Sequence, residues 1–298
     1  MVLMKSGFVS IIGRPNVGKS TLLNSLINKK IAITSDKAQT TRNIIHGIYN
    51  DCDSQIIFVD TPGIHKPKHK LGTVLNEKAY KMAGDVDIVL FLVDASTGLG
   101  KGDLFIINKL KTANNQNVFL IINKIDLIKK DQLMLLIDEY QKLYDFQEII
   151  PLSALTRNNI KELIKTIKSY LTDDIKYYDN ETITNVSTRF IISEIVREKV
   201  LALTKEEIPH AVTCFTENYY EEDDIVYINV VIVVDRDSLK KIIIGKKGAM
   251  LKNIGTLARQ DIEVFLDKKV YLETFVKTIK NWREKERYLK ELGLNELE

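Results

Sequence analysis

Short apolar runs of strand length alternate with longer stretches of helical period between Gly7 and about Leu171. This alternation is typical of a parallel sheet with helices packed on its faces, an α/β fold. It predicts strands at Phe8–Ile12, Ile44–Tyr49, Gln55–Asp60, Ile88–Asp94, Asn117–Ile122 and Glu148–Pro151, a six-stranded, mostly parallel sheet. It predicts helices at Lys19–Ile27, Thr73–Ala83, Gly102–Ala113, Asp131–Leu143 and Asn159–Leu171.

One pair of predicted strands departs from the parallel pattern. Only Asn50–Ser54 separates the second strand from the third, which is too short for a crossover helix. We therefore expect an antiparallel hairpin at that edge of the sheet. The first domain is expected to occupy residues 1–173, and residues 174–185, where the apolar periodicity is lost, are expected to form a linker.

The rhythm of apolar residues changes in the expected second domain, residues 186–298. The pattern predicts an α-β-β-α-α-β unit of the α+β class. Its members are a helix at Phe190–Leu203, strands at Ala211–Thr216 and Ile225–Val234, short helices at Ser238–Ile244 and Ala249–Arg259, and a β ribbon at Ile262–Ile279. A last helix is expected at Arg283–Leu292.

Composition excludes several classes of protein. Hydrophobic residues make up 45% and charged residues 28% of the chain, the proportions of a globular protein and not of a disordered one. The longest apolar runs, such as Ile88–Val93, are far shorter than the ~20 residues that span a bilayer. The first residues lack a secretory leader, so we expect a cytoplasmic protein. The two cysteines, Cys52 and Cys214, offer neither a disulfide framework nor a cysteine-based metal site.

Charge is unevenly distributed, although the formal net charge is only +3. The stretch Ser238–Arg259 carries six basic residues and no acid. Glu217–Asp224 carries five acids and no base, and we interpret it as a solvated hairpin loop. The second domain is therefore expected to offer a localised basic surface and not a general affinity for nucleic acids.

A phosphate-binding loop is predicted near the start of the chain. The segment Gly13–Ser20 reads GRPNVGKS, and it follows a predicted strand and opens a predicted helix, as this motif requires. Backbone N–H groups of such a loop surround phosphates, and the helix N-terminus adds a positive dipole. Lys19 reaches the β- and γ-phosphates, and Ser20 ligates Mg²⁺. The nucleotide-binding residues predicted here are Gly13, Asn16, Val17, Gly18, Lys19, Ser20 and Thr21.

Further motifs follow the third, fifth and sixth predicted strands. Asp60 to Gly63 (DTPG) places a carboxylate near the metal and a backbone N–H near the γ-phosphate. Asn123-Lys124-Ile125-Asp126 follows the fifth strand, and Ser153-Ala154-Leu155 follows the sixth. All lie at the carboxyl ends of parallel strands, where open α/β sheets bind ligands.

The second and third of these motifs favour guanine as the base. A carboxylate such as Asp126 accepts hydrogen bonds from the ring N–H and the exocyclic amine of guanine, a donor pair that adenine lacks on that edge. The backbone N–H of Ala154 is positioned to donate to the guanine carbonyl oxygen. An ATPase is therefore disfavoured.

Together these motifs resemble the Ras-like superfamily of P-loop GTPases. The resemblance implies GTP or GDP as ligand, Mg²⁺ held by Ser20, Asp60 and a threonine, and catalytic roles for Lys19, Asn16, Thr41 and Gly63. We prefer Thr41 as the third metal ligand, with Thr40 as the alternative. Asn16 is the candidate to hold a monovalent cation, K⁺. Ile64 stands where Ras-type enzymes have a water-orienting glutamine, so we expect slow intrinsic hydrolysis.

A second motif lies in the basic stretch of the second domain. Gly245-Lys246-Lys247-Gly248, between two short predicted helices, resembles the Gly-x-x-Gly loop of KH domains, which clamps four nucleotides by their backbone. The order of elements is similar to the type II KH fold. The RNA-binding residues expected are Ile244, Gly245, Lys246, Lys247, Gly248 and Lys252, and Trp282 either stacks on nucleotides or caps the domain.

A GTPase domain followed by a KH domain resembles the Era family of bacterial GTPases. This resemblance implies that the KH domain binds the 3′ end of 16S rRNA and that the protein acts in assembly of the 30S ribosomal subunit as a monomer. It also implies that some of the protein associates peripherally with the inner membrane. The alternative is a GTP-gated protein or membrane interaction module whose KH-like half does not bind RNA.

Overall fold

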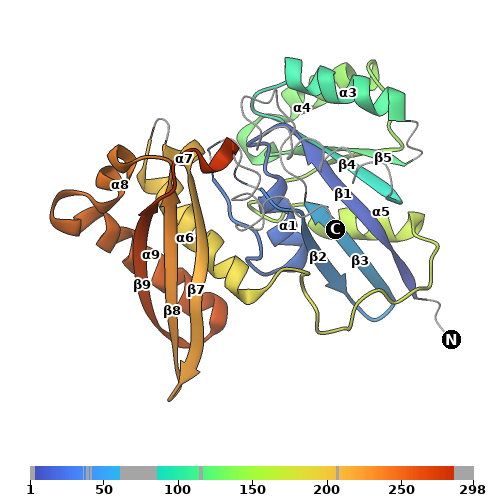
Figure 1. Cartoon of the computed structure of the whole chain (residues 1–298). Helices are drawn as coiled ribbons and strands as arrows, with labels where there is room; N and C mark the ends of the chain where they lie inside the picture. Colours follow the sequence, from blue (N-terminus) through green and yellow to red (C-terminus); the bar gives the residue numbers. More distant parts are fainter. Residues whose placement is uncertain are drawn as a thin grey trace. The chain divides into compact units, whose positions relative to one another are not determined.

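The computed structural model describes residues 4–35, 37, 40, 42–60, 86–113, 117–205 and 208–284. The chain forms two compact units (Figure 1), and the main boundary between them in the sequence lies between Asn185 and Val186. Each unit has its own sheet, and each is described separately below.

The first unit is built on a six-stranded sheet of order β2-β3-β1-β4-β5-β6. Its strands are β1 (Lys5–Gly13), β2 (Ile45–Asn50), β3 (Ser54–Asp60), β4 (Ile88–Asp94), β5 (Val118–Asn123) and β6 (Glu148–Pro151). All neighbouring strands are parallel except β2 and β3, which form the predicted antiparallel hairpin. Every residue of β3, β4 and β5 is buried, as expected for strands covered on both faces.

Helices cover both faces of this sheet (Figure 1). They are α1 (Lys19–Ile27), α3 (Lys101–Ala113), α4 (Lys130–Gln141) and α5 (Ile160–Tyr170), with the short 3₁₀ helix η1 (Ile125–Leu127). One face packs its side chains, among them Phe91 and Leu120, against Ile106 and Leu110 of α3 and Tyr140 of α4. The predicted helix Thr73–Ala83 lies outside the described residues.

The polar stretch of residues 172–185 belongs to the first unit and is hydrogen-bonded to its sheet. The Ile48 N–H of edge strand β2 donates to the Ile183 carbonyl oxygen at 2.9 Å. Gln55 of β3, which is 1% exposed, donates from Nε2 to the Tyr178 carbonyl oxygen at 2.8 Å and accepts from the Tyr178 N–H at 2.9 Å. Backbone groups of this segment thus contribute to its attachment to the sheet, and they need no apolar periodicity to do so.

The second unit has a three-stranded sheet of order β7-β8-β9. Strands β7 (Val212–Glu222) and β8 (Ile225–Val234) are antiparallel, and β9 (Lys269–Thr278) runs parallel to β8. The helices are α6 (Thr188–Leu203), α7 (Ile208–Ala211), α8 (Asp237–Ile244) and α9 (Ala249–Leu266), with the 3₁₀ turns η2 (Lys246–Gly248) and η3 (Trp282–Glu284). Apart from the single turn α7, this is the predicted α-β-β-α-α-β order.

Two predictions for the second unit need correction. The ribbon expected at Ile262–Ile279 is wrong, because α9 continues to Leu266 and only one strand, β9, follows. Ile254, Ala258 and Ile262 are buried at successive i, i+4 positions, so the helical period extends beyond its predicted end. Of the last helix expected at Arg283–Leu292, only the first two residues are described, and they lie in η3.

The acidic stretch Glu217–Asp224 is mostly strand and not loop, contrary to our prediction. Strand β7 extends to Glu222, and only Asp223 and Asp224 form the turn. Both turn residues have positive φ, 49° and 64°, which is the conformation of a two-residue hairpin whose twist matches that of the strands. Trp282 is fully buried, and its Nε1 donates to the Ala211 carbonyl oxygen at 3.2 Å. It therefore caps the domain and does not stack on nucleotides.

Candidate functional site

The phosphate-binding loop connects β1 to α1, as its sequence predicts. Gly18 precedes the helix with φ 101°, a conformation that side-chain-bearing residues rarely adopt. A Cβ atom at this position would also overlap the amide nitrogen of Asn123. Glycine is therefore required here both by the backbone and by the close approach of the base-recognition strand. The first turn of α1 contains Ser20 and Thr21, and Val17 is buried beneath the loop.

Lys19 is folded back against the phosphate loop. Its Nζ donates to the carbonyl oxygens of Gly13 at 3.2 Å and Arg14 at 3.0 Å, and the residue is 7% exposed. Burial lowers the pKa of Lys19 to about 8, although the negative charge of Asp60 partly opposes this effect. An anion that accepts from Nζ would favour the ammonium form and raise this pKa again.

This lowered pKa predicts that nucleotide binding takes up a proton at alkaline pH. Bound phosphates stabilise the ammonium, so affinity for GDP with Mg²⁺ should be constant well below pH 8 and fall above it, by up to about tenfold per pH unit. Calorimetric titration at pH 8.5 to 9 in buffers of different ionisation enthalpy measures the uptake. The same titrations at pH 7 serve as the control, with much less proton uptake expected. Affinity that stays unchanged up to pH 9, with no proton uptake, would contradict the lowered pKa of Lys19.

The donors expected for Mg²⁺ lie next to each other. Ser20 Oγ donates to Asp60 Oδ2 at 2.9 Å, which joins the start of α1 to the end of β3. Asp60 is fully buried. A hydroxyl and a carboxylate are the hard oxygen ligands that Mg²⁺ uses together with substrate phosphates, so these two residues fit the ion.

Asn123 and Lys124 join the base-recognition segment to the phosphate loop. The buried Asn123 side chain donates from Nδ2 to the Val17 carbonyl oxygen at 2.8 Å and accepts from the Ala154 N–H at 2.9 Å. Lys124 Nζ donates to the Asn16 carbonyl oxygen at 2.9 Å. The motifs after β1, β5 and β6 are thus tied together by the side chains that the sequence singled out.

The remaining base-recognition residues differ in exposure. Asp126 is exposed in η1, which leaves its carboxylate accessible to a ligand. Ser153 is buried, and its Oγ accepts from the Thr156 N–H at 3.2 Å. Leu155 is 78% exposed. The Ala154 N–H, which we expected to face guanine, is engaged with Asn123 in this structure.

Several predicted site residues lie outside the described residues. They are Thr41, Gly63 and Ile64. Thr40, the alternative metal ligand, is described and half-buried.

Sequence reasoning missed three residues beside the phosphate loop. Asp94, at the end of β4, accepts from Lys124 Nζ at 2.6 Å. Arg14, inside the loop, donates from Nε to Asp103 at the start of α3, at 2.8 Å. Asp94 could have been found, because it is a carboxylate at the same strand edge as Asp60 and Asn123. The pairing of Arg14 with Asp103 has no signal in the local sequence.

The predicted RNA-binding loop lies between α8 and α9, as expected. Gly245 has φ 71°, and a Cβ there would lie 2.7 Å from Cβ of Met250, so a side chain at this position does not fit. The Gly248 N–H donates to the Gly245 carbonyl oxygen at 3.2 Å, which closes a tight turn. Lys246, Lys247 and Lys252 are exposed, and Ile244 is half-buried. The loop thus exposes two cationic side chains beside the N-terminus of an 18-residue helix, whose first turn adds a third, Lys252.

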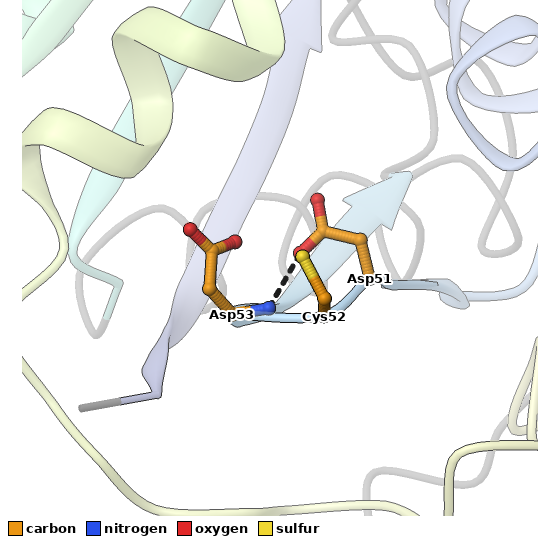
Figure 2. Close-up of side chains that lie close together, drawn as sticks. All are labelled: Asp51, Cys52 and Asp53. Carbon is orange, nitrogen blue, oxygen red and sulfur yellow. Dashed lines mark hydrogen bonds between the residues drawn. The ribbon is translucent and has the colours of Figure 1, made fainter. Parts of the chain in front are cut away.

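A second group of potential metal ligands lies in the turn between β2 and β3. Asp51, Cys52 and Asp53 bring their ligand atoms within 4.8 Å of one another (Figure 2). Lys168 donates from Nζ to both carboxylates, at 2.7 Å to Asp53. Partial burial alone would raise the pKa of Asp51, but hydrogen bonds from Lys168 and Ser54 outweigh it and hold this pKa below its usual value. The carboxylates therefore already have a cationic partner, and the group is explained as an ion-paired turn.

Comparison with known proteins agrees with this geometry in both units. Residues 8–124 match a family of GTPases described as 50S ribosome-binding, and residues 207–283 match the KH domain family. A crystal structure of an Era variant from Aquifex aeolicus bound to GDP and AlF₄⁻ is 42% identical, with a TM-score of 0.93 over 98% of this chain and 99% of that one. The same values are found for a crystal structure of Era with MgGDPNP and nucleotides 1506–1542 of 16S ribosomal RNA. In the part of the chain that the structure describes, no helix combines the length and apolarity needed to cross a membrane.

Proposed function

The chain belongs to the Era family of KH-domain GTPases, and from this we propose that it binds and hydrolyses GTP and that its nucleotide state controls binding of the 3′ end of 16S rRNA during assembly of the 30S subunit. One observation carries the proposal. A near full-length match to Era coincides with the two sites described above, the phosphate and base loops joined by Asn123 and the exposed Gly-Lys-Lys-Gly loop.

The residues around the phosphate loop support distinct roles in hydrolysis. Ser20 and Asp60, with Thr41 or Thr40, would hold Mg²⁺, which neutralises phosphate charge when bound. Lys19 supplies a cation for the β- and γ-phosphates, and the loop amides add hydrogen bonds to their oxygens. The Gly63 N–H would sense the γ-phosphate, and Asp126 would read the guanine. The Ala154 N–H would have to exchange Asn123 Oδ1 for the guanine carbonyl oxygen in order to contribute.

We propose a slow intrinsic rate that depends on K⁺. The side chain of Ile64 cannot hydrogen-bond the attacking water, so another group must help to stabilise the transition-state charge. Asn16 lies within the phosphate loop with φ 67°, and its side chain is the candidate ligand for a monovalent cation beside the phosphates.

Phosphate release from GTP tests the enzymatic part of this proposal. With Mg²⁺ present, the chain should release phosphate faster in KCl than in NaCl, whereas Asn16→Ala should give the same slow rate in both salts. The Lys142→Ala variant, changed at an exposed residue just after α4, serves as a control that should keep the salt difference. No release above background in either salt would contradict a GTPase, and equal rates in the unmodified chain would remove only the role of K⁺.

The distribution of charge in the KH unit supports binding of a short RNA segment. Three exposed lysines gather at the Gly-Lys-Lys-Gly loop and the start of α9, while β7 ends in acidic residues that repel phosphates. We therefore propose a local clamp on one short single-stranded segment. We further propose that the protein acts as a cytoplasmic monomer, of which a fraction binds peripherally at the inner membrane, on the family resemblance alone.

A further inference from the structure

The side chain of Arg14 extends from the phosphate loop to residues 97–103, which connect β4 to the first turn of α3. We call these residues the Arg14 seat. Its Nε donates to Asp103 Oδ1 at 2.8 Å, and its Nη2 donates to Thr97 Oγ1 at 3.1 Å and to the Gly98 carbonyl oxygen at 3.2 Å. The guanidinium therefore has three partners on one short segment. Arg14 thus differs from Lys19 and Ser20, the residues of the loop that are proposed to bind the phosphates and the metal.

The seat is shaped for this side chain. Asp103 is fully buried, and its second oxygen accepts from the Gly100 N–H at 2.9 Å. A Cβ at Gly102 would lie 2.7 Å from Cδ of Arg14, and one at Gly100 would lie 2.6 Å from its Nη1. Both distances are too short for a methyl group, so the two glycines provide the space that Arg14 occupies.

A second cation ties the loop to the same segment. Lys124 Nζ contacts the Asn16 carbonyl oxygen and Asp94 Oδ2. Asp94 also accepts from the Ser96 N–H at 2.9 Å and from Ser96 Oγ at 2.6 Å, which fixes the first turn of the segment. Residues 94–103 thus hold the phosphate loop at Arg14 and, through Lys124, at Asn16.

We propose that the Arg14 seat is a positioning device that holds the phosphate loop in its binding shape before the nucleotide arrives. The inference rests on the proposed binding of guanine nucleotides. A loop whose amides already converge loses less conformational freedom on binding, so affinity rises without any new contact to the ligand. Arg14 and Asp103 are positioning residues in this sense, and Asp94 supports them through Lys124.

Stability of the fold alone does not account for such a seat. Asp103 is buried and Arg14 partly so, and such an ion pair contributes little net stability because desolvation of the charges offsets their attraction. Apolar side chains of similar size often give the same or greater stability. A charged pair with a planar hydrogen-bonding fork instead fixes one geometry. The ion pair between Arg14 and Asp103 therefore serves to fix the conformation of the phosphate loop.

The Gly102→Ala variant tests the seat without removing any charge. The added methyl should displace Arg14 and weaken GDP binding about three- to tenfold, the effect of having to order the loop on binding. Fluorescent GDP should dissociate correspondingly faster. Lys101→Ala, at an exposed residue of the same turn, is the matched control and should bind GDP as the unmodified chain does. The midpoint of thermal unfolding without nucleotide, measured for each variant, separates loss of loop shape from loss of fold.

A double-mutant cycle makes the test specific to Arg14. In an Arg14→Ala background, which should itself weaken GDP binding by a similar factor, Gly102→Ala should have no further effect because the methyl has nothing to displace. Additive effects would overturn the proposal, and so would Arg14→Ala binding GDP as tightly as the unmodified chain. If the unmodified chain binds no GDP at all, the proposed function fails first, and this result is distinguishable from both.

Discussion

Replacing Asp126 by asparagine should change the preferred base from guanine to xanthine. An asparagine presents one donor and one acceptor where the carboxylate presents two acceptors, so the ring N–H and amine of guanine can no longer both be satisfied. Xanthine carries a carbonyl in place of that amine and matches the amide. The discrimination between the two nucleotides should shift by a factor on the order of 10⁴, as expected where buried polar groups of a ligand gain or lose partners.

Competition between GDP and XDP for the variant measures this shift. Asp131→Asn, at a carboxylate in the first turn of α4, makes the same chemical change away from the base motif and should keep the preference for GDP. If Asp126→Asn retains its preference for GDP, the base assignment is wrong. If the unmodified chain prefers ADP to GDP, the ATPase interpretation must be restored.

Placing aspartate at both Gly245 and Gly248 should greatly weaken RNA binding while leaving GTP turnover intact. Two carboxylates would face the sugar-phosphate chain, and a side chain at Gly245 would collide with Met250. Affinity for a fluorescent RNA with the sequence of the 16S rRNA 3′ end should fall on the order of a hundredfold. Turnover should not change, because the loop belongs to the second unit and the nucleotide site to the first.

A charge-matched variant separates local clamping from general repulsion. Asn218→Asp with Asn229→Asp adds the same charge to the sheet of the second unit, at paired positions of β7 and β8. It should reduce RNA affinity only slightly, and the reduction should disappear at higher salt. If the Gly245 and Gly248 variant binds RNA normally, the KH-like unit does not bind RNA through this loop. The chain would then be a GTP-gated protein or membrane interaction module.

Helices and strands with clear boundary residues could be predicted from the sequence. Strands β4, β6 and β8 and helix α1 begin and end where the sequence predicts, because each is an apolar or amphipathic run bounded by glycine, proline, asparagine or acidic residues. The predicted end of α9 at Arg259 is wrong, since the residues after it are apolar enough for either a helix or a strand. Which of the two forms is decided by burial of Ile262 in the core, a tertiary effect.

Some residues of the candidate site could likewise be predicted from the sequence, and others could not. Contiguous motifs identify Lys19, Ser20, Asp60 and Asn123, because phosphate, metal and base impose residue types at fixed spacing. The partners of Arg14 follow no such spacing, since Asp103 lies 89 positions away along the chain. The two meet only because β4 lies next to β1 in the sheet. The local sequence does not indicate that these two strands are neighbours.

The segment that ends the first unit has a consequence for solubility. Strand β2 is the outermost strand of the six-stranded sheet, and an uncovered outer strand offers unpaired amides to other copies of the chain. Residues 183 and 184 cover this edge strand, because Gly47 forms an antiparallel bridge with Thr184 and the Ile48 N–H donates to the Ile183 carbonyl oxygen. Shortening this stretch would therefore remove the cover of β2. It would uncover a template on which other copies of the chain can aggregate.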